Sequence, residues 1–506
     1  MSSYKLEHEK FITGHNGTNY LEVTMATSIS CFACFARDLF LLSSVGKLLR
    51  PRILSEFLLL ILPNIISVTI FCDFIELFAF LILFICTVYC MYLKQTHKVV
   101  PSTLYVTNLD NRKAFITYFR SIINVCTAVA ILAVDFPVFP RKLAKTETYG
   151  FGGMDIGVGL FVVANAIVSP ETKNRDVKIP AYSHLKKAVF SCIPLLILGV
   201  ARLLAVKGTD YHEHVTEYGV HWNFFFTLVA LKLSLSILYC IIPVNKSGSV
   251  ATFILILHQS LLSSGLSSYI LNGSDGKGGR NGLLDANREG IFSLPGYISI
   301  YMFGVQLGAF LFQERKNLKE WWTAAKKLSY KFILFTLGMS IGHLKIEPVS
   351  RRLANASFVL WVMSLSYFMI LECLVGEIII TCIKAQIKIN MTSKIKDTMK
   401  KEAQHSLVQT TAKLQRNVQW KDDSNKLHSE VCTNKPDFDV CTMNAVSFNS
   451  LLFFLLANVM TGLVNMNIST LQTSDFSAVA ILVVYMFLLC LVAVSLKAKN
   501  ISTKIW

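Results

Sequence analysis

The sequence predicts an all-α membrane protein, a polytopic transmembrane helical bundle of about 13 spans. Three observations predict this class: 53% of the 506 residues are hydrophobic, the mean hydropathy is +0.50, and apolar runs recur along the whole chain. Because about 20 apolar residues in a helix cross the hydrocarbon core of a bilayer, each run of that length is a candidate span. The composition does not fit a water-soluble globular enzyme.

The candidate spans alternate with polar connections, and the polar residues 1–21 lack the form of a cleaved signal. The first apolar run is long enough to remain in the membrane. In chain order, the expected spans are centred on residues 22–45, 53–72, 74–93, 116–134, 150–168, 187–206, 222–242, 250–271, 291–312, 328–343, 357–383, 446–466 and 476–496.

The charge distribution predicts the orientation. The chain holds 49 Lys and Arg against 32 Asp and Glu, a net charge of +17. In a soluble protein this excess would suggest nucleic acid, but here the basic residues gather in alternate connections, as membrane insertion requires. We therefore expect no nucleic-acid partner, a cytosolic carboxyl terminus and a lumenal amino terminus.

This orientation divides the chain into five parts: a lumenal amino tail (1–21), spans one to eleven (22–383), a cytosolic linker (384–445), spans twelve and thirteen (446–496) and a cytosolic tail (497–506). Asn16 and Asn272 begin glycosylation acceptor sequences on the expected lumenal side. The 13 cysteines have no spacing that would hold a metal, so no metal site is expected.

The most informative stretch runs from Asp135 to Gly150, between two apolar runs. Pro137 and Pro140 stop any helix that enters it. A straight helix would hold Asp135 and Lys145 about 15 Å apart, but a turn broken by proline can bring them together. The stretch predicts a carboxylate and an ammonium side by side at a membrane boundary. The alternative is a loop whose basic residues only set the topology.

Three polar groups precede the seventh span: Glu217, His221 and Asn223. Glu217 and His221 stand four residues apart, so an early start of the helix would place them on one face, where the carboxylate could orient the imidazole. The alternative is an interfacial aromatic belt around Trp222, in which His221 has no role.

Arginines occur at two connections on the side where basic residues are scarce. Arg288 and Glu289 precede the ninth span, and Arg351, Arg352 and Asn355 precede the eleventh. Planar guanidinium groups suit phosphate, so Arg288 and Arg352 are candidate contacts for a lipid or CoA phosphate. Glu289, Arg351 and Asn355 beside them are candidate substrate-binding residues. The alternative is that they form salt bridges that anchor the topology.

Two further features lie within the expected spans. Gly153 and Gly157 have the small-residue spacing that lets helices approach closely, and the alternative is an anion site at this helix start, near Asp155. Asn458 and Asn465 predict a polar stripe on span twelve that faces neighbouring helices or a polar cavity.

Several long motifs follow one another along nearly the whole chain: Asn-Gly-Thr at 16–18, Ala-Val-Asp-Phe-Pro-Val-Phe-Pro-Arg at 133–141, Ala-Lys-Thr-Glu at 144–147, Met-Asp-Ile-Gly-Val-Gly at 154–159, Glu-Tyr-Gly-Val-His-Trp-Asn-Phe-Phe-Phe-Thr at 217–227, Asn-Arg-Glu-Gly-Ile at 287–291, Ser-Arg-Arg-Leu-Ala-Asn at 350–355 and Ala-Asn-Val-Met-Thr-Gly-Leu-Val-Asn at 457–465. With these motifs in this order, the chain resembles the inositol acyltransferases of glycosylphosphatidylinositol (GPI) anchor synthesis. These are the phosphatidylinositol-glycan class W proteins of animals and the GPI-anchored wall transfer proteins of fungi. The amino tail and residues 384–445 match weakly.

The resemblance implies a multi-pass enzyme of the endoplasmic-reticulum membrane. Such an enzyme transfers a fatty acyl group, typically palmitoyl, from acyl-CoA to the inositol 2-hydroxyl of glucosaminyl-phosphatidylinositol. Acyl-CoA would be a substrate, with no tightly bound cofactor, and the acceptor and the surrounding membrane lipid would be the other partners. The resemblance also implies that the essential pair is Asp135 and Lys145.

The chemistry of the implied reaction assigns roles to this pair. An inositol hydroxyl is too weak an acid to attack a thioester unaided, so a base must accept its proton and a positive group must stabilise the oxyanion. We take Asp135 as the base, with Lys145 orienting it or meeting the oxyanion. His221 is the rival base. No Ser or Cys stands beside a base in these motifs, which favours direct transfer over a covalent acyl-enzyme.

The alternative function is a multispan transporter or scramblase of a glycolipid. Its cavity would also need buried charges and broken helices. Such an activity requires a sealed membrane, whereas acyl transfer does not.

Overall fold

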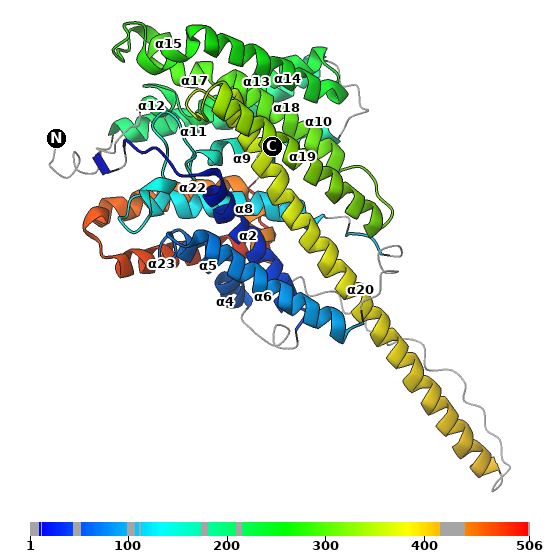
Figure 1. The fold of residues 1–506 in the computed structure, drawn as a ribbon. Coiled ribbons are helices and arrows are strands. Elements are labelled where there is room, and N and C mark those ends of the chain that lie inside the picture. Colours follow the sequence, from blue (N-terminus) through cyan, green and yellow to red (C-terminus); the bar gives the residue numbers. More distant parts are fainter. Residues whose placement is uncertain are drawn as a thin grey trace.

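The computed structural model describes residues 10–11, 13–43, 52–98, 107–110, 113–173, 181–208, 215–414 and 441–503. In this part of the chain the regular elements are all helices, and the only pairing of β type is a single bridge between Thr18 and Phe151. Ten of the described helices are long and apolar enough to cross a membrane. The predicted all-α polytopic class is confirmed (Figure 1).

The helices follow one another with short connections. In chain order they are α2 (Tyr20–Phe40), α4 (Arg52–Glu56), the π-helical turn η1 (Phe57–Ile61), α5 (Leu62–Ser67), α6 (Ile75–Thr96), α8 (Ala114–Ala133), the 3-10 turn η2 (Arg141–Leu143), α9 (Ile156–Ala166), α10 (Pro170–Lys173), α11 (Ala181–Gly208), α12 (Val215–Tyr218), α13 (Phe224–Ile241), η3 (Val244–Lys246), α14 (Ser247–Leu261), η4 (Leu262–Leu266), α15 (Ser267–Asn272), α16 (Gly282–Ala286), α17 (Arg288–Phe292), α18 (Leu294–Leu311), α19 (Leu318–Lys345), α20 (Ala356–Leu414), α21 (Thr442–Phe448), α22 (Ser450–Asn467), η5 (Thr470–Gln472) and α23 (Asp475–Ala498).

Ten expected spans each contain one of the long apolar helices, and the other three depart from that form for local reasons. The span expected at 53–72 is divided into α4, η1 and α5, with a proline in the first turn of α5. The span expected at 150–168 contains only the 11-residue helix α9, because an irregular, glycine-containing segment precedes it. The span expected at 328–343 lies within the 28-residue helix α19, whose first half carries lysines.

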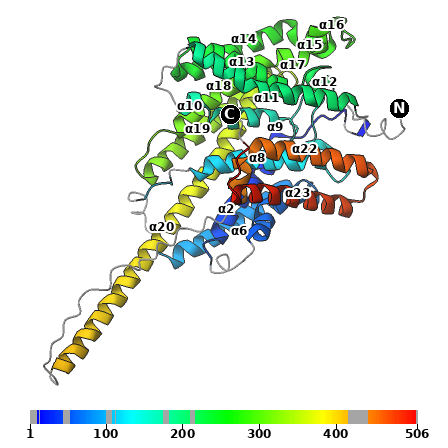
Figure 2. The ribbon, with the colours of Figure 1, turned by 180° about the vertical axis from the view of Figure 1, so that it is seen from behind.

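Helix α20 forms the centre of the bundle. It packs against α19, α2, α8, α18 and α9, and its Phe358 and Trp361 are fully buried. The helix has 59 residues and extends beyond the other helices at one end, as Figures 1 and 2 show. The cytosolic linker expected at 384–445 therefore begins as a continuation of this helix, and residues 415–440 lie outside the described part of the chain.

The outer surface of the bundle is apolar. Large side chains on α6, α11 and α19, such as Phe84, Ile197 and Leu337, are more than half exposed. A soluble protein rarely leaves apolar patches of this extent in water, whereas lipid tails cover them at no cost. The exposed faces of these helices are therefore suited to contact with lipid.

The closest approach between α9 and α20 depends on Gly159. A Cβ atom built there would meet Val362 Cγ2 at 2.5 Å, whereas a Cβ at Gly157 would have nothing within 4 Å. The sequence pointed to Gly153 and Gly157 for this approach, and the structure places it at Gly159 instead. The small-residue pattern predicted a packed helix face correctly, but Gly157 makes no such contact, and a Cβ atom at Gly153 would meet the Leu143 carbonyl oxygen at 3.2 Å rather than α20.

We expect Gly159→Val to destabilise the bundle by about 1–3 kcal/mol, because its side chain would overlap that of Val362. The measurement is the thermal unfolding midpoint in detergent. Gly157→Val is the matched control on the same helix and should change the midpoint little. Equal effects of the two substitutions would contradict this assignment.

Candidate active site

Arg141 holds the turn that follows α8. The chain leaves the helix after Ala133. The guanidinium group of Arg141 then donates to the carbonyls of Val134 (2.9 Å), Phe136 (3.1 Å) and Phe139 (2.8 and 3.1 Å). A helix end and a proline-containing turn leave such carbonyls without backbone partners. One side chain therefore joins three carbonyls of the turn and fixes its shape.

Asp135 lies inside this turn and is 2% exposed. Its Oδ2 accepts a hydrogen bond of 2.7 Å from Nδ2 of Asn465, on α22. Burial raises the pKa of Asp135 to about 6, although the hydrogen bond from Asn465 and the charges of Arg141 and Lys145 oppose the rise. A carboxylate with this pKa is ionised near neutral pH and is a stronger base than an exposed one.

A chain of charges begins at Lys145. Its Nζ lies 2.7 Å from Oε2 of Glu217, whose Oε1 lies 3.5 Å from Nη1 of Arg351. Arg351 Nε in turn lies 2.8 Å from Oδ1 of Asp155. The chain closes on the starting segment, because Asp155 Oδ2 accepts hydrogen bonds from the backbone N–H and the hydroxyl of Thr146. These contacts tie three separate connections together.

The electrostatics of this chain favour ionised Glu217. Burial opposes its ionisation, but Lys145 and Arg351 lower its pKa to about 2. Burial raises the pKa of Asp155, against the opposing charge of Arg351 and the hydrogen bonds from Thr146. The Lys145 side chain is 37% exposed, whereas Glu217 and Arg351 are 13% and 6% exposed. The ammonium group is therefore the accessible member of a buried network.

The two residues that the sequence paired lie in one electrostatic neighbourhood, but each has a different partner. Lys145 contacts Glu217, and Asp135 accepts from Asn465. The charge of Lys145 still acts on Asp135, because it lowers the pKa of that carboxyl. Their catalytic roles remain predictions.

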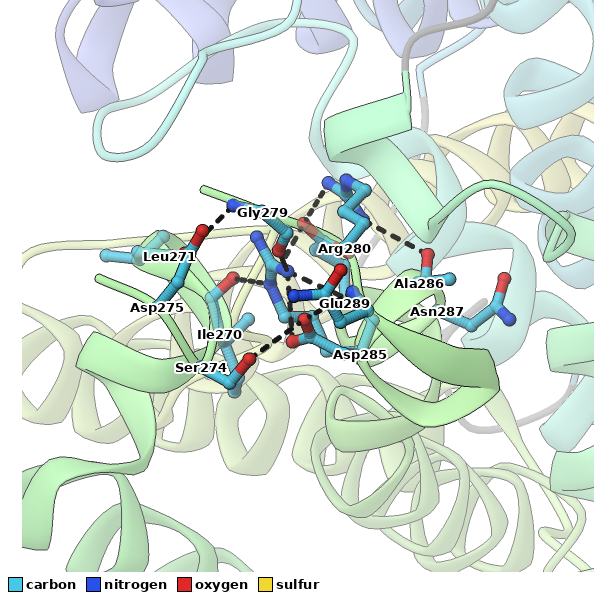
Figure 3. Close-up of polar contacts among 12 residues, drawn as sticks. Ile270, Leu271, Ser274, Asp275, Gly279, Arg280, Asp285, Ala286, Asn287 and Glu289 are labelled. Atoms are coloured by element: carbon cyan, nitrogen blue, oxygen red, sulfur yellow. Dashed lines mark hydrogen bonds and ion pairs between the residues drawn. The ribbon is translucent and has the colours of Figure 1, made fainter. Parts of the chain in front are cut away.

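A second charged cluster surrounds Glu289, at the start of α17 (Figure 3). Its Oε1 lies 2.7 Å from Nη2 of Arg280 and 2.8 Å from Nη2 of Arg352. Arg288 is 1% exposed and donates to the carbonyls of Ile270 and Gly279 and to Asp285. Arg288 thus holds the connection before α17 in place, which is the anchoring role that the sequence left as the alternative.

The structure separates Glu217 from the His221 imidazole. Helix α12 ends at Tyr218 and α13 begins at Phe224, so the two residues do not share a helix face. The carboxylate contacts Lys145 instead, and the His221 side chain is exposed. The backbone N–H of His221 donates to Oδ1 of Asn287.

The remaining predicted residues stabilise helix ends or contact their own helix. Asn223 accepts from the N–H groups of Phe225 and Phe226 at the start of α13. Asn355 accepts from Phe358 N–H at the start of α20. Asn458 is exposed and donates to the Phe454 carbonyl one turn earlier. Of the predicted stripe on α22, Asn465 is the member that reaches the site.

Sequence reasoning missed Arg141, Thr146 and Arg280 as members of these networks. Arg141 could have been found, because a guanidinium that directly follows a proline-broken helix end has several free carbonyls within reach. Arg280 lies in a glycine-rich segment with no periodicity, so no sequence signal identifies it. Among the described residues, no group of three His, Cys, Asp or Glu side chains could hold a metal ion.

Comparison with known proteins places this arrangement in a family. The GWT1 family model matches residues 4–496. The chain belongs to the GWT1 family. It is 38% identical over 523 residues to glucosaminyl-phosphatidylinositol-acyltransferase PIGW of Bos taurus and 36% identical over 521 residues to that of Homo sapiens. It is 31% identical over 550 residues to GPI-anchored wall transfer protein 1 of Saccharomyces cerevisiae. Each alignment covers 100% of both chains, and the predicted family is confirmed.

We expect Arg351→Met to lower the free energy of unfolding by about 3–5 kcal/mol, because it leaves the buried Asp155 and Glu217 without their shared cation. The measurement is denaturant or thermal unfolding in detergent.

Lys142→Met is the control, because Lys142 forms a more exposed ion pair with Glu22. Such a pair contributes about 0–1 kcal/mol. An Arg351→Met protein as stable as this control would show that the charged chain does not hold the three connections together.

Proposed function

We propose that this GWT1-family protein transfers a fatty acyl group from acyl-CoA to the inositol 2-hydroxyl of glucosaminyl-phosphatidylinositol. The full-length likeness to proteins named glucosaminyl-phosphatidylinositol-acyltransferase supports the acceptor and the reaction type. The observation that carries the chemical proposal is the buried Asp135 carboxylate in its proline-broken turn at the end of a spanning helix.

The proposed step is a direct transfer. Asp135 accepts the proton of the inositol hydroxyl while the hydroxyl oxygen attacks the thioester carbonyl carbon. The carbon–sulfur bond then breaks, and the CoA thiolate leaves and takes up a proton. The pKa of Asp135, raised to about 6 by burial, is close to the working pH, where proton transfer by a general base is most effective.

The side chain of Asn465, beside Asp135, supports this assignment. Asn465 Oδ1 is buried and has no hydrogen-bond partner among the described residues, so it can accept a hydrogen bond from an incoming hydroxyl. The same amide holds Asp135 through its Nδ2. An acceptor sugar alcohol would thus find an orienting oxygen and a base together.

Lys145 supplies the positive charge of the proposed mechanism. It is the most exposed member of the charged chain, and its contact with Glu217 orients it. A fixed ammonium group near the reacting carbonyl stabilises the oxyanion that develops during attack. Replacement of Lys145 would therefore affect the transition state more than substrate binding.

Arg352 is the better candidate than Arg288 for a lipid phosphate. Arg288 gives its donors to protein carbonyls and to Asp285. Arg352 contacts Glu289 through Nη2, and its Nε has no hydrogen-bond partner among the residues that the structure describes. We propose that this remaining donor capacity meets the phosphate of the acceptor lipid.

We place the protein in the endoplasmic-reticulum membrane, where GPI anchors are assembled. The proposed orientation has a lumenal amino terminus and a cytosolic carboxyl terminus. The accumulation of basic residues in alternate connections supports this orientation.

We expect Asp135→Asn to reduce acyl transfer by about 100-fold to 10,000-fold, because the amide cannot accept the hydroxyl proton. The assay uses detergent-solubilised protein, acyl-CoA and glucosaminyl-phosphatidylinositol, with the acylated lipid detected by mass spectrometry. His221→Ala is the control and should retain most of the activity. Turnover in detergent, without a sealed membrane, also distinguishes acyl transfer from the transporter alternative. If His221→Ala lost activity and Asp135→Asn kept it, the base would be the His221 imidazole instead of Asp135.

The activity should rise as the pH increases through about 6, because Asp135 acts only when it is ionised. The hydrogen bond from Asn465 lowers the pKa of Asp135, so its removal in Asn465→Ala should move this midpoint to higher pH. The measurement is the pH profile of kcat for the two proteins. An unchanged midpoint in Asn465→Ala would contradict the assignment of Asp135 to this ionisation.

A further inference from the structure

A second site lies at the end of the bundle remote from Asp135. A cavity of about 530 Å³ opens between α18, α19 and α20, and its volume falls in the range of ligand pockets, ~300–1,000 Å³. Its polar lining comes from three lysines of α19 and from glutamines at and beyond the end of α18, with a buried tyrosine of α20. These residues are Lys326, Lys327, Lys331, Gln306, Gln313 and Tyr367.

The course of the chain places this cavity at the opposite membrane face from the candidate active site. Helix α18 follows the connection of Glu289, and the cavity lies at its far end. Helix α19 starts before the cavity, borders it between Thr323 and Lys331, and returns to the connection that holds Arg351. Figures 1 and 2 show α19 beside α20 at the end from which α20 extends.

The three lysines carry charge without compensation. Within the described residues, Lys326, Lys327 and Lys331 have no ion pair and no side-chain hydrogen bond, and no carboxylate lines the cavity. Lys327 and Lys331 stand four residues apart, an arrangement in which like charges destabilise a helix. Three ammonium groups around one cavity create a positive potential that attracts an anion.

The position of the lysines along α19 sets their depth in the membrane. The helix has 28 residues. At 1.5 Å per residue it is about 42 Å long, against about 30 Å for the hydrocarbon core of a bilayer. The excess of about 12 Å corresponds to about eight residues, so Lys326 and Lys327 lie near the boundary of the hydrocarbon core, and Lys331 lies deeper, with a flexible side chain that can extend toward the headgroups.

An apolar stripe continues from the cavity along the outer face of α19. Ile333, Leu337 and Ile341 are 53%, 57% and 60% exposed, and they follow one another at helical spacing. A ligand that occupies both features needs an anionic head and an apolar tail. Free phosphate and the soluble part of CoA provide an anionic head but no apolar tail.

We propose that this cavity binds the phosphate-containing headgroup of an anionic phospholipid, whose acyl chains lie along the exposed stripe of α19. Basic pockets between spanning helices on the cytosolic side bind such headgroups through lysine and arginine. Under the proposed orientation, the lipid belongs to the cytosolic leaflet. The site is separate from Asp135, so the inference stands whether or not the proposed acyl transfer is correct.

The test compares the full-length protein with two triple variants by native mass spectrometry after addition of phosphatidylinositol or phosphatidylcholine. The pocket variant is Lys326→Gln, Lys327→Gln and Lys331→Gln. The control variant removes the same charge from the α20 extension through Lys384→Gln, Lys388→Gln and Lys396→Gln. We expect phosphatidylinositol retention by the pocket variant to be at least about tenfold lower than that of the control variant. Phosphatidylcholine retention should be equal in all three proteins.

Further arms keep the test decisive. If the triple variant does not fold, the single variant Lys331→Gln replaces it and should also retain less phosphatidylinositol than the unsubstituted protein. Inorganic phosphate or CoA at millimolar concentration should leave the bound lipid in place. Equal retention by the pocket and control variants would overturn the proposal, and displacement by inorganic phosphate or CoA would identify a site for a soluble phosphate instead.

Discussion

The charged chain from Lys145 through Glu217 and Arg351 to Asp155 is the interaction on which the site depends. Its members come from three connections that the spanning helices bring to one membrane face. Isolated charges at this depth would be costly, so each must lie beside a partner of opposite sign. The requirement for pairing thus fixes the loops relative to one another and leaves Lys145 as the accessible positive group.

The requirement for polar partners also determines the contacts of the arginine side chains. Arg141 satisfies the carbonyls of the turn after α8, Arg288 those near Gly279, and Arg351 joins two carboxylates. Arg352 alone of these keeps a buried donor without a partner among the described residues. Arginines at the mouth of a membrane protein therefore divide into those that build the loops and those that retain capacity for a ligand.

The sequence predicted the fold class and that polar residues from separate connections gather at one end of the bundle, because apolar periodicity and helix-breaking prolines act locally. It did not predict the partners. Glu217 contacts Lys145 rather than His221 because Gly219, at φ +117°, turns the chain before α13 begins, and only the packed structure shows this. Gly159 likewise makes the contact expected of Gly157, since the spacing of small residues does not show which of them faces α20.

The hydrogen bond between Asp135 and Asn465 joins residues 330 positions apart. During synthesis, the carboxyl group enters the membrane region long before the amide exists, and the long helix α20 must be made in between. The polar surroundings of Asp135 are therefore complete only when α22, the second-last long helix, has been inserted. A chain that stops before this point leaves the Asp135 carboxylate without its hydrogen bond from Asn465, so the local structure around this carboxylate depends on nearly the last helix to be made.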